Sequence, residues 1–164
     1  MGDVDGPEKL SHVADDGRAR MVDVGGKAVT SRRAVASGRV VMRPETRRVA
    51  LESGGPKGPV FEVARLAGIG AAKRTDELIP LCHSLPVDGV DVTIAPEGDD
   101  ALVIRAAVTT SWRTGVEMEA LTAVSVTALT IIDMLKAIEK TIEVRDVRLE
   151  EKTGGKSGDW RRPA

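Results

Sequence analysis

A long apolar stretch constrains this chain more than any other part of its sequence. Residues 115–140 read as one helix, with Glu117 and Glu119 in its first turns and Asp133 and Lys136 about four turns later. The apolar positions require a partner surface along one face. Because the ionisable groups are not needed for that packing, we expect this helix to carry a functional site.

The composition argues against a nucleic-acid partner. The 164 residues are 41% hydrophobic, enough for one domain with its own core. Lys and Arg number 24 against 25 Asp and Glu, so no overall field attracts a polyanion. One Phe, two Trp and no Tyr leave few rings on which bases could stack. Any anion must therefore be held by local basic clusters.

Compartment and domain organisation follow from equally simple features. A single cysteine excludes an intrachain disulfide framework, and the polar first twenty residues contain no apolar signal core. We expect that no apolar run approaches membrane-spanning length, and we predict a cytoplasmic protein without a membrane partner. Residues 1–20 are predicted to be a disordered arm, 21–160 a single catalytic domain and 161–164 a tail.

The order of the predicted elements indicates the fold class. Alternating apolar residues predict strands, and the spacing of small residues predicts a second helix packed closely on another backbone. The resulting order is βαββαβ, which indicates an α+β, ferredoxin-like, four-stranded antiparallel sheet with two main helices on one face. Besides the long helix, the elements are a strand at 38–43, a short helix at 44–52, a helix at 60–74, a hairpin of 90–94 with 102–108, and a strand at 142–150 with an irregularity at Arg145–Asp146.

Two residues of the long helix are candidates for proton transfer, and a lysine in a loop is notable for its setting. Asp133 and Lys136 are three residues apart and share one helix face, where the lysine can lower the aspartate pKa. An ordinary exposed ion pair is the alternative, but the apolar neighbours Ile131 and Ile132 favour a partly buried, functional pair. Lys57 lies in a loop whose prolines and glycines hold it in a turn.

The two glutamates at the start of the long helix differ in whether a structural role can explain them. Glu117 fits a capping box with Thr114, and this structural role is favoured over chemistry. Glu119 has no such explanation. It lies roughly 21 Å along the helix from Asp133, so either the two act on one molecule from different subunits, or only one of them acts.

Two further segments contain residues that could bind an anion. His83 follows Leu81 and Cys82 in a loop; a structural histidine is favoured, with an anion contact as the alternative. One Cys beside one His is too little for a zinc site. The Gly-rich segment 152–159 lacks the first glycine of a P-loop. It could form a flexible phosphate nest, but composition favours a solvated tail.

Seven short motifs, taken in order, resemble one family. They are Met21–Val24, Val60–Phe61, Ala64–Ile69, Ala71–Thr75, Leu78–His83, Thr114–Thr122 and Gly154–Asp159. Together they resemble the MoaC family of molybdenum cofactor biosynthesis, over about residues 11–160. The resemblance implies a lyase that converts 3′,8-cyclic dihydro-GTP to cyclic pyranopterin monophosphate and pyrophosphate.

The resemblance also implies a role for each candidate residue. Asp133 and Lys136 would be the acid/base pair and Lys57 the loop lysine. The assembly implied is a homohexamer, a trimer of dimers, with sites between subunits. No cofactor or protein-bound metal is expected, and a magnesium ion accompanying the triphosphate is left open. The implied substrate contacts are Leu81, Cys82, His83, Glu117, Met118 and Glu119, with anion contacts at Arg32, Lys73, Arg74 and Lys152.

Two other classes of function compete with this interpretation. A noncatalytic nucleotide-binding or regulatory module on the same fold would need the basic residues but not Asp133. An RNA-binding domain of this fold would need aromatic residues on its strands, and the predicted strands have none.

Overall fold

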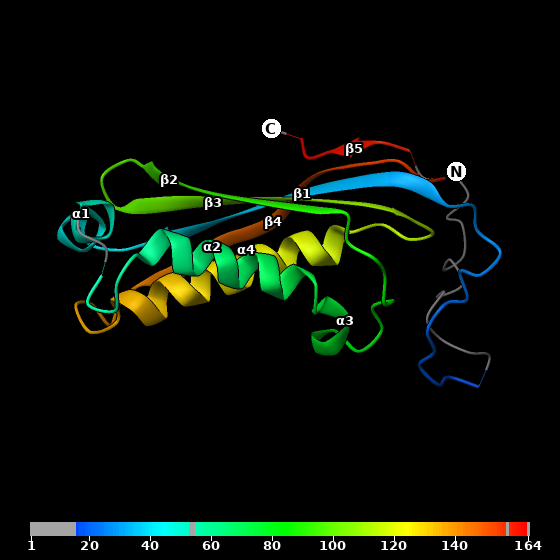
Figure 1. The fold of residues 1–164 in the computed structure, drawn as a ribbon, viewed down its shortest axis with the longest axis horizontal. Helices are drawn as coiled ribbons and strands as arrows, with labels where there is room; N and C mark the ends of the chain where they lie inside the picture. Colours follow the sequence, from blue (N-terminus) through cyan, green and yellow to red (C-terminus); the bar gives the residue numbers. More distant parts are fainter. Residues whose placement is uncertain (1–15, 53–54, 157, 164) are drawn as a thin grey trace, which may run out of the picture.

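The computed structural model describes residues 16–52, 55–156 and 158–163, so residues 1–15 of the predicted arm lie outside it. All its strands join in one open antiparallel sheet of order β2-β3-β1-β4-β5, and α2 and α4 cover one face of it (Figure 1). The elements are β1 (Thr30–Val41), α1 (Pro44–Glu52), α2 (Val60–Ala72), α3 (Thr75–Leu78), β2 (Gly89–Glu97), β3 (Ala101–Trp112), α4 (Glu117–Leu135), β4 (Glu143–Thr153) and β5 (Trp160–Arg161).

The sheet confirms the α+β class and corrects the number of strands from four to five. The extra strand, β5, has two residues and pairs with the end of β4. Two residues are too few to show a period in the sequence. β1 is also longer than predicted and begins at Thr30. Its residues Ala34–Gly38 are all buried, so they form a continuous run instead of the alternation by which a strand is recognised.

The predicted irregularity in β4 is confirmed. The pairing of β1 with β4 shifts register twice, between Val35 and Ala36 and between Ser37 and Arg39. Asp146 lies in the left-handed region, with φ of 54°. Such bulges bend a strand and increase its twist.

The close approach predicted for the second helix is also confirmed. A Cβ on Gly68 would lie 2.1 Å from Thr127 Oγ1 and 3.0 Å from the Ala123 carbonyl oxygen. Near the other end of the helix pair, a Cβ on Gly55 would lie 3.0 Å from the Met134 carbonyl oxygen. Because residue numbers rise along α2 as they fall along α4, the two helices are antiparallel. The loop before α2 therefore lies at the end of α4.

The start of α4 differs from the prediction. The N-cap is Val116, with no side-chain capping hydrogen bond, and Thr114 Oγ1 donates to the Gly115 carbonyl instead. The capping box is therefore wrong, since Glu117 is the first helical residue and not the third. The helix ends at Leu135, about a turn before the predicted end at 140.

The apolar character of α4 has a structural explanation. Among the described residues, this helix is long and apolar enough to cross a membrane, which corrects the expectation that no run reaches that length. However, 56% of the apolar window is buried inside the protein. The buried side chains pack against α2 and the sheet, as expected for a core helix.

Candidate functional site

The three predicted catalytic residues meet at the end of α4. Lys57 Nζ lies 2.6 Å from Asp133 Oδ2, and Lys136 Nζ lies 2.6 Å from Asp133 Oδ1. The expectation of a partly buried pair is wrong, because the Asp133 side chain is 51% exposed. Its neighbours Ile131 and Met134 face the core, so Asp133 lies on the open side of the helix.

The two lysines determine the protonation of this cluster. Hydrogen bonds from Lys136 and then Lys57 lower the pKa of Asp133 to about 2. At neutral pH the aspartate is therefore a carboxylate held between two ammonium donors. A substrate that draws one lysine away would raise the aspartate pKa and make the carboxylate a better base.

A closed turn holds Lys57 in this position, as the sequence predicted. Gly55 N donates to the Gly58 carbonyl at 2.8 Å, and Gly58 N donates to the Gly55 carbonyl at 3.0 Å. Gly58 has φ of +106°, a conformation that side chains disfavour. The lack of a Cβ at Gly55 lets the turn rest on the last turn of α4, next to Asp133.

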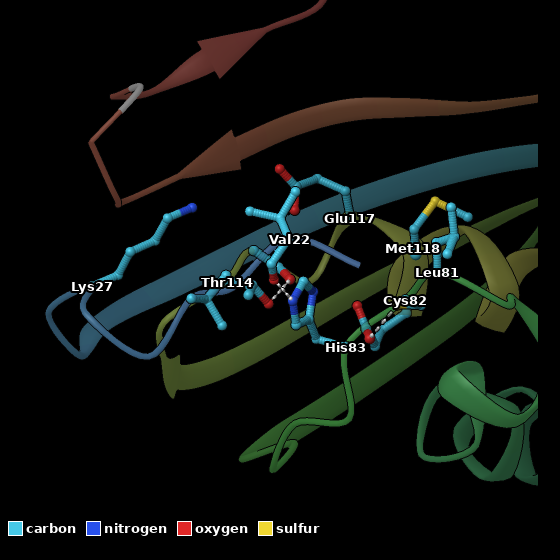
Figure 2. A pocket seen from close by; sticks show the side chains of 11 residues that line it. Val22, Lys27, Leu81, Cys82, His83, Thr114, Glu117 and Met118 are labelled. Atoms are coloured by element: carbon cyan, nitrogen blue, oxygen red, sulfur yellow. Dashed lines mark hydrogen bonds between the residues drawn. The ribbon is translucent and has the colours of Figure 1, made fainter. Parts of the chain in front are cut away.

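At the other end of α4, a pocket of about 360 Å³ collects the predicted substrate contacts (Figure 2). His83 Nε2 lies 2.6 Å from the Val22 carbonyl oxygen, which ties the segment before β1 to the pocket. That segment contributes residues the sequence did not indicate. The described lining residues are Val22, Val24, Lys27, Leu81, Cys82, His83, Thr114, Gly115, Glu117, Met118 and Glu119.

Glu119 is the buried acid of this pocket, only 2% exposed. Its Oε1 lies 3.6 Å from Cys82 Sγ, and Oε2 has no hydrogen-bond partner among the described residues. Burial raises the pKa of Glu119. Burial and the nearby Glu119 carboxylate raise the pKa of Cys82 to about 11, so the thiol stays protonated and is not a nucleophile.

A second pocket, of about 1050 Å³, adjoins the first and carries most of the positive charge. Lys27, Thr114, Gly115 and Glu117 line both pockets. Glu117 forms an ion pair with Lys152 at 3.2 Å, which explains its position better than helix capping does. The described cationic residues of the second pocket are Lys27, Arg32, Arg113, Lys152 and Lys156.

The predicted anion contacts divide into two groups. Arg32 and Lys152 line the second pocket, whereas Lys73 and Arg74 line neither of these two pockets. The exposed Arg74 donates to Glu77 at 2.9 Å. Lys73 and Arg74 are close to Leu81–His83 in the sequence, but among the described residues they do not line either of these two pockets.

Two cations of the second pocket, Lys27 and Arg113, were missed by the sequence reasoning, and a third, Lys156, was considered but not favoured. Lys27 follows a tight turn, in which its amide donates to the Val24 carbonyl at 3.0 Å. Arg113 lies between β3 and α4, and its Nε is buried without a partner in the described chain. Lys156 belongs to the Gly-rich segment for which composition favoured a solvated tail; its side chain is exposed and also lines this pocket. Gly25 and Gly26, directly before Lys27, were the sequence feature that could have indicated a turn presenting this lysine.

An acid–base cluster together with cation-lined pockets is typical of enzymes that act on small charged molecules. Comparison with known proteins identifies the group to which this one belongs. Residues 21–155 match the model of the MoaC family, and the chain belongs to that family.

Several relatives are similar over nearly the whole chain. The chain is 57% identical over 162 residues to cyclic pyranopterin monophosphate synthase 3 of Mycobacterium tuberculosis (strain ATCC 25618 / H37Rv), covering 99% of this chain and 90% of that protein. It is 55% identical to cyclic pyranopterin monophosphate synthase of a Nocardioides species, over 97% and 99% of the two chains. The corresponding protein of Streptomyces avermitilis is 57% identical over 98% and 96%.

Proposed function

We propose that the protein is a cyclic pyranopterin monophosphate synthase, a lyase that converts 3′,8-cyclic dihydro-GTP to cyclic pyranopterin monophosphate and pyrophosphate in molybdenum cofactor biosynthesis. The relatives named as this synthase, 57% identical over 99% of the chain, support the identity of the reaction. The geometric support is the cluster of Asp133 between Lys57 and Lys136.

The reaction requires groups that move protons. Opening one ring, closing another and forming a cyclic phosphate involve no net redox change, so general acids and bases suffice. In the proposed site the Asp133 carboxylate accepts a proton, and the ammonium groups of Lys57 and Lys136 supply protons to leaving nitrogen or oxygen atoms. The short distances between the three groups allow a proton to be returned within the cluster.

The leaving pyrophosphate requires cations. We place the triphosphate in the larger pocket, where Arg32 and Lys152 donate charge-assisted hydrogen bonds to phosphate oxygens. Such bonds strengthen as negative charge builds on the leaving group, so they lower the barrier to phosphate cyclisation. The ring system would lie in the smaller pocket beside Glu119 and His83. A magnesium ion on the triphosphate could share the charge.

The proposed site takes its parts from two subunits. Asp133 and Glu119 lie at opposite ends of α4, roughly 21 Å apart along the helix, so one chain cannot close both ends around one small molecule. A two-fold pair would bring the end of one α4 to the start of another. We propose a homohexamer, a trimer of dimers, located in the cytoplasm.

We also propose that the fold is ferredoxin-like with β5 added at one edge. The strand order β2-β3-β1-β4 and the two helices on one face support this description. The alternative function, a noncatalytic nucleotide-binding module, would use the cation-lined pocket but has no use for an aspartate held between two lysines. The cluster at the end of α4 therefore favours an enzyme.

The test is pyrophosphate release from 3′,8-cyclic dihydro-GTP by the purified protein, with Asp133→Asn as the matched variant. The amide keeps the shape of the carboxylate and removes its proton-accepting capacity, so turnover should fall by about two or more orders of magnitude. No release by the wild-type protein would refute the proposed reaction. Release at the wild-type rate by Asp133→Asn would refute the role of the aspartate.

A further inference from the structure

Arg32 in the larger pocket is held in one orientation by backbone carbonyl groups. Its Nε donates to the Trp112 carbonyl at 3.0 Å, and its Nη2 donates to the Arg113 carbonyl at 3.1 Å. Two bonds from a planar group fix its plane as well as its position. Nη1 makes no hydrogen bond to another described residue, so it is the nitrogen left to bind a ligand.

Gly155 lies directly against this free nitrogen. A Cβ built on Gly155 would lie 2.1 Å from Arg32 Nη1 and 2.9 Å from its Cζ. The guanidinium cannot move aside without breaking its bonds to the two carbonyls. Both Gly155 and Arg32 line the larger pocket, and a hydrogen atom at residue 155 is therefore the only side chain that leaves Nη1 in place.

The backbone around Gly155 fixes its position over the arginine. Gly154 and Gly155 have φ of +86° and +81°, and Gly154 N donates to Asp159 Oδ1 at 3.0 Å. A Cβ on Gly154 would lie 2.2 Å from the Ser31 carbonyl oxygen, next to Arg32. The double glycine thus packs this turn against β1, where an ordinary residue would hold the turn away.

We infer that Gly155 is a positioning residue, which keeps Arg32 Nη1 directed into the pocket so that it can bind a phosphate oxygen. The inference rests on the proposed function only in taking a polyphosphate as the ligand. The cost of orienting the guanidinium is met during folding, so binding does not have to supply it. A side chain at position 155 would displace the donor without removing any charge from the pocket.

Alanine at two glycines with similar backbones separates this effect from backbone strain. Gly158 has φ of +69°, and a Cβ there would meet nothing within 4 Å. Gly158→Ala therefore introduces the same kind of strain without touching Arg32. Pyrophosphate binding to the full-length protein is measured by calorimetry for the wild type, Gly155→Ala and Gly158→Ala. We expect Gly155→Ala to bind about tenfold or more weakly than Gly158→Ala, the scale of one charged hydrogen bond.

A double-mutant cycle with Arg32→Ala tests whether the effect passes through the arginine. In the Arg32→Ala background, Gly155→Ala should change pyrophosphate affinity no more than Gly158→Ala does. Equal affinities of the two single alanine variants would overturn the inference. So would an effect of Gly155→Ala that stays as large without the arginine.

If Gly155→Ala does not fold, the folding of the double variant tests the inference instead. Recovery of the fold in Arg32→Ala/Gly155→Ala would support the clash with the guanidinium, and continued failure would overturn the inference in favour of a purely structural glycine. Turnover of 3′,8-cyclic dihydro-GTP by the wild-type protein is measured separately. Absence of turnover refutes the proposed reaction, while the pyrophosphate comparison still tests Gly155.

Discussion

Replacing Gly68 by alanine tests the packing of α2 on α4 most directly. The added Cβ would lie 2.1 Å from Thr127 Oγ1, and Thr127 is fully buried, with its hydroxyl donating to the Ala123 carbonyl at 2.7 Å. The hydroxyl cannot turn to solvent, so the helices must separate or the hydrogen bond must break. Gly70 is in the same helix and has open space at its Cβ position, which makes Gly70→Ala a matched control.

The magnitudes of these effects are large enough to separate the two variants. Alanine is better than glycine inside a helix by about 0.8–1 kcal/mol, so Gly70→Ala should raise the free energy of unfolding by up to that amount. At Gly68 the same gain is opposed by about 1–3 kcal/mol for overpacking and about 1 kcal/mol for the hydrogen bond. Gly68→Ala should therefore be less stable than Gly70→Ala by about 2–4 kcal/mol.

Urea denaturation at one protein concentration measures the difference, since an oligomer's stability depends on concentration. Adding Thr127→Ala to Gly68→Ala should recover part of the loss, because the atom that the new methyl group meets is then absent. Equal unfolding free energies for Gly68→Ala and Gly70→Ala would refute the close approach of the two helices.

Three further predictions concern the site. Because its pKa is lowered to about 2, Asp133 should titrate near pH 2 in carbon-13 NMR, and a midpoint near 4 would contradict the double ion pair. The contribution of Asp133 to the free energy of unfolding should be complete above its normal pKa of 3.8 and should be lost as the pH falls toward 2. Lys57→Ala and Lys136→Ala should each slow single-turnover reaction by about two or more orders of magnitude. A mixture of the two variants should regain activity if the lysines of one site come from different chains; normal turnover with weakened binding would instead make them phosphate ligands. With its pKa raised to about 11, Cys82 should react with iodoacetamide at pH 8 about a hundredfold more slowly than in the denatured protein, and equal rates would contradict its burial.

The sequence was most informative where local spacing alone determines position. Asp133 and Lys136 share a helix face because they are three residues apart, and the ion pair follows from that spacing. The Pro/Gly loop predicted a turn at Lys57, but its contact with Asp133 depends on the antiparallel packing of α2 and α4. Apolar neighbours suggested burial of the pair, yet they face inward while Asp133 faces outward.

Features that depend on tertiary contacts were not predictable in this way. The cations of the larger pocket come from segments far apart in the chain, and nothing local relates Lys27 to Arg113 or Lys156. The capping box failed because Val116, not Thr114, takes the N-cap conformation. Glu117 satisfies the spacing rule but pairs with Lys152 from β4, a contact about which local spacing gives no information.

The two register shifts in β4 determine which side of the sheet Lys152 reaches. Side chains alternate between faces, so removing one residue from a strand turns every later side chain to the opposite face. At each shift β4 has one residue more than β1, so deleting that extra residue would restore regular pairing and leave Lys152 opposite Ala34, on the side of Glu117. Changes in the length of this strand are therefore tolerated at the two shifts, whereas a deletion that breaks the regular pairing would turn Lys152 away and remove one positive charge from the pocket.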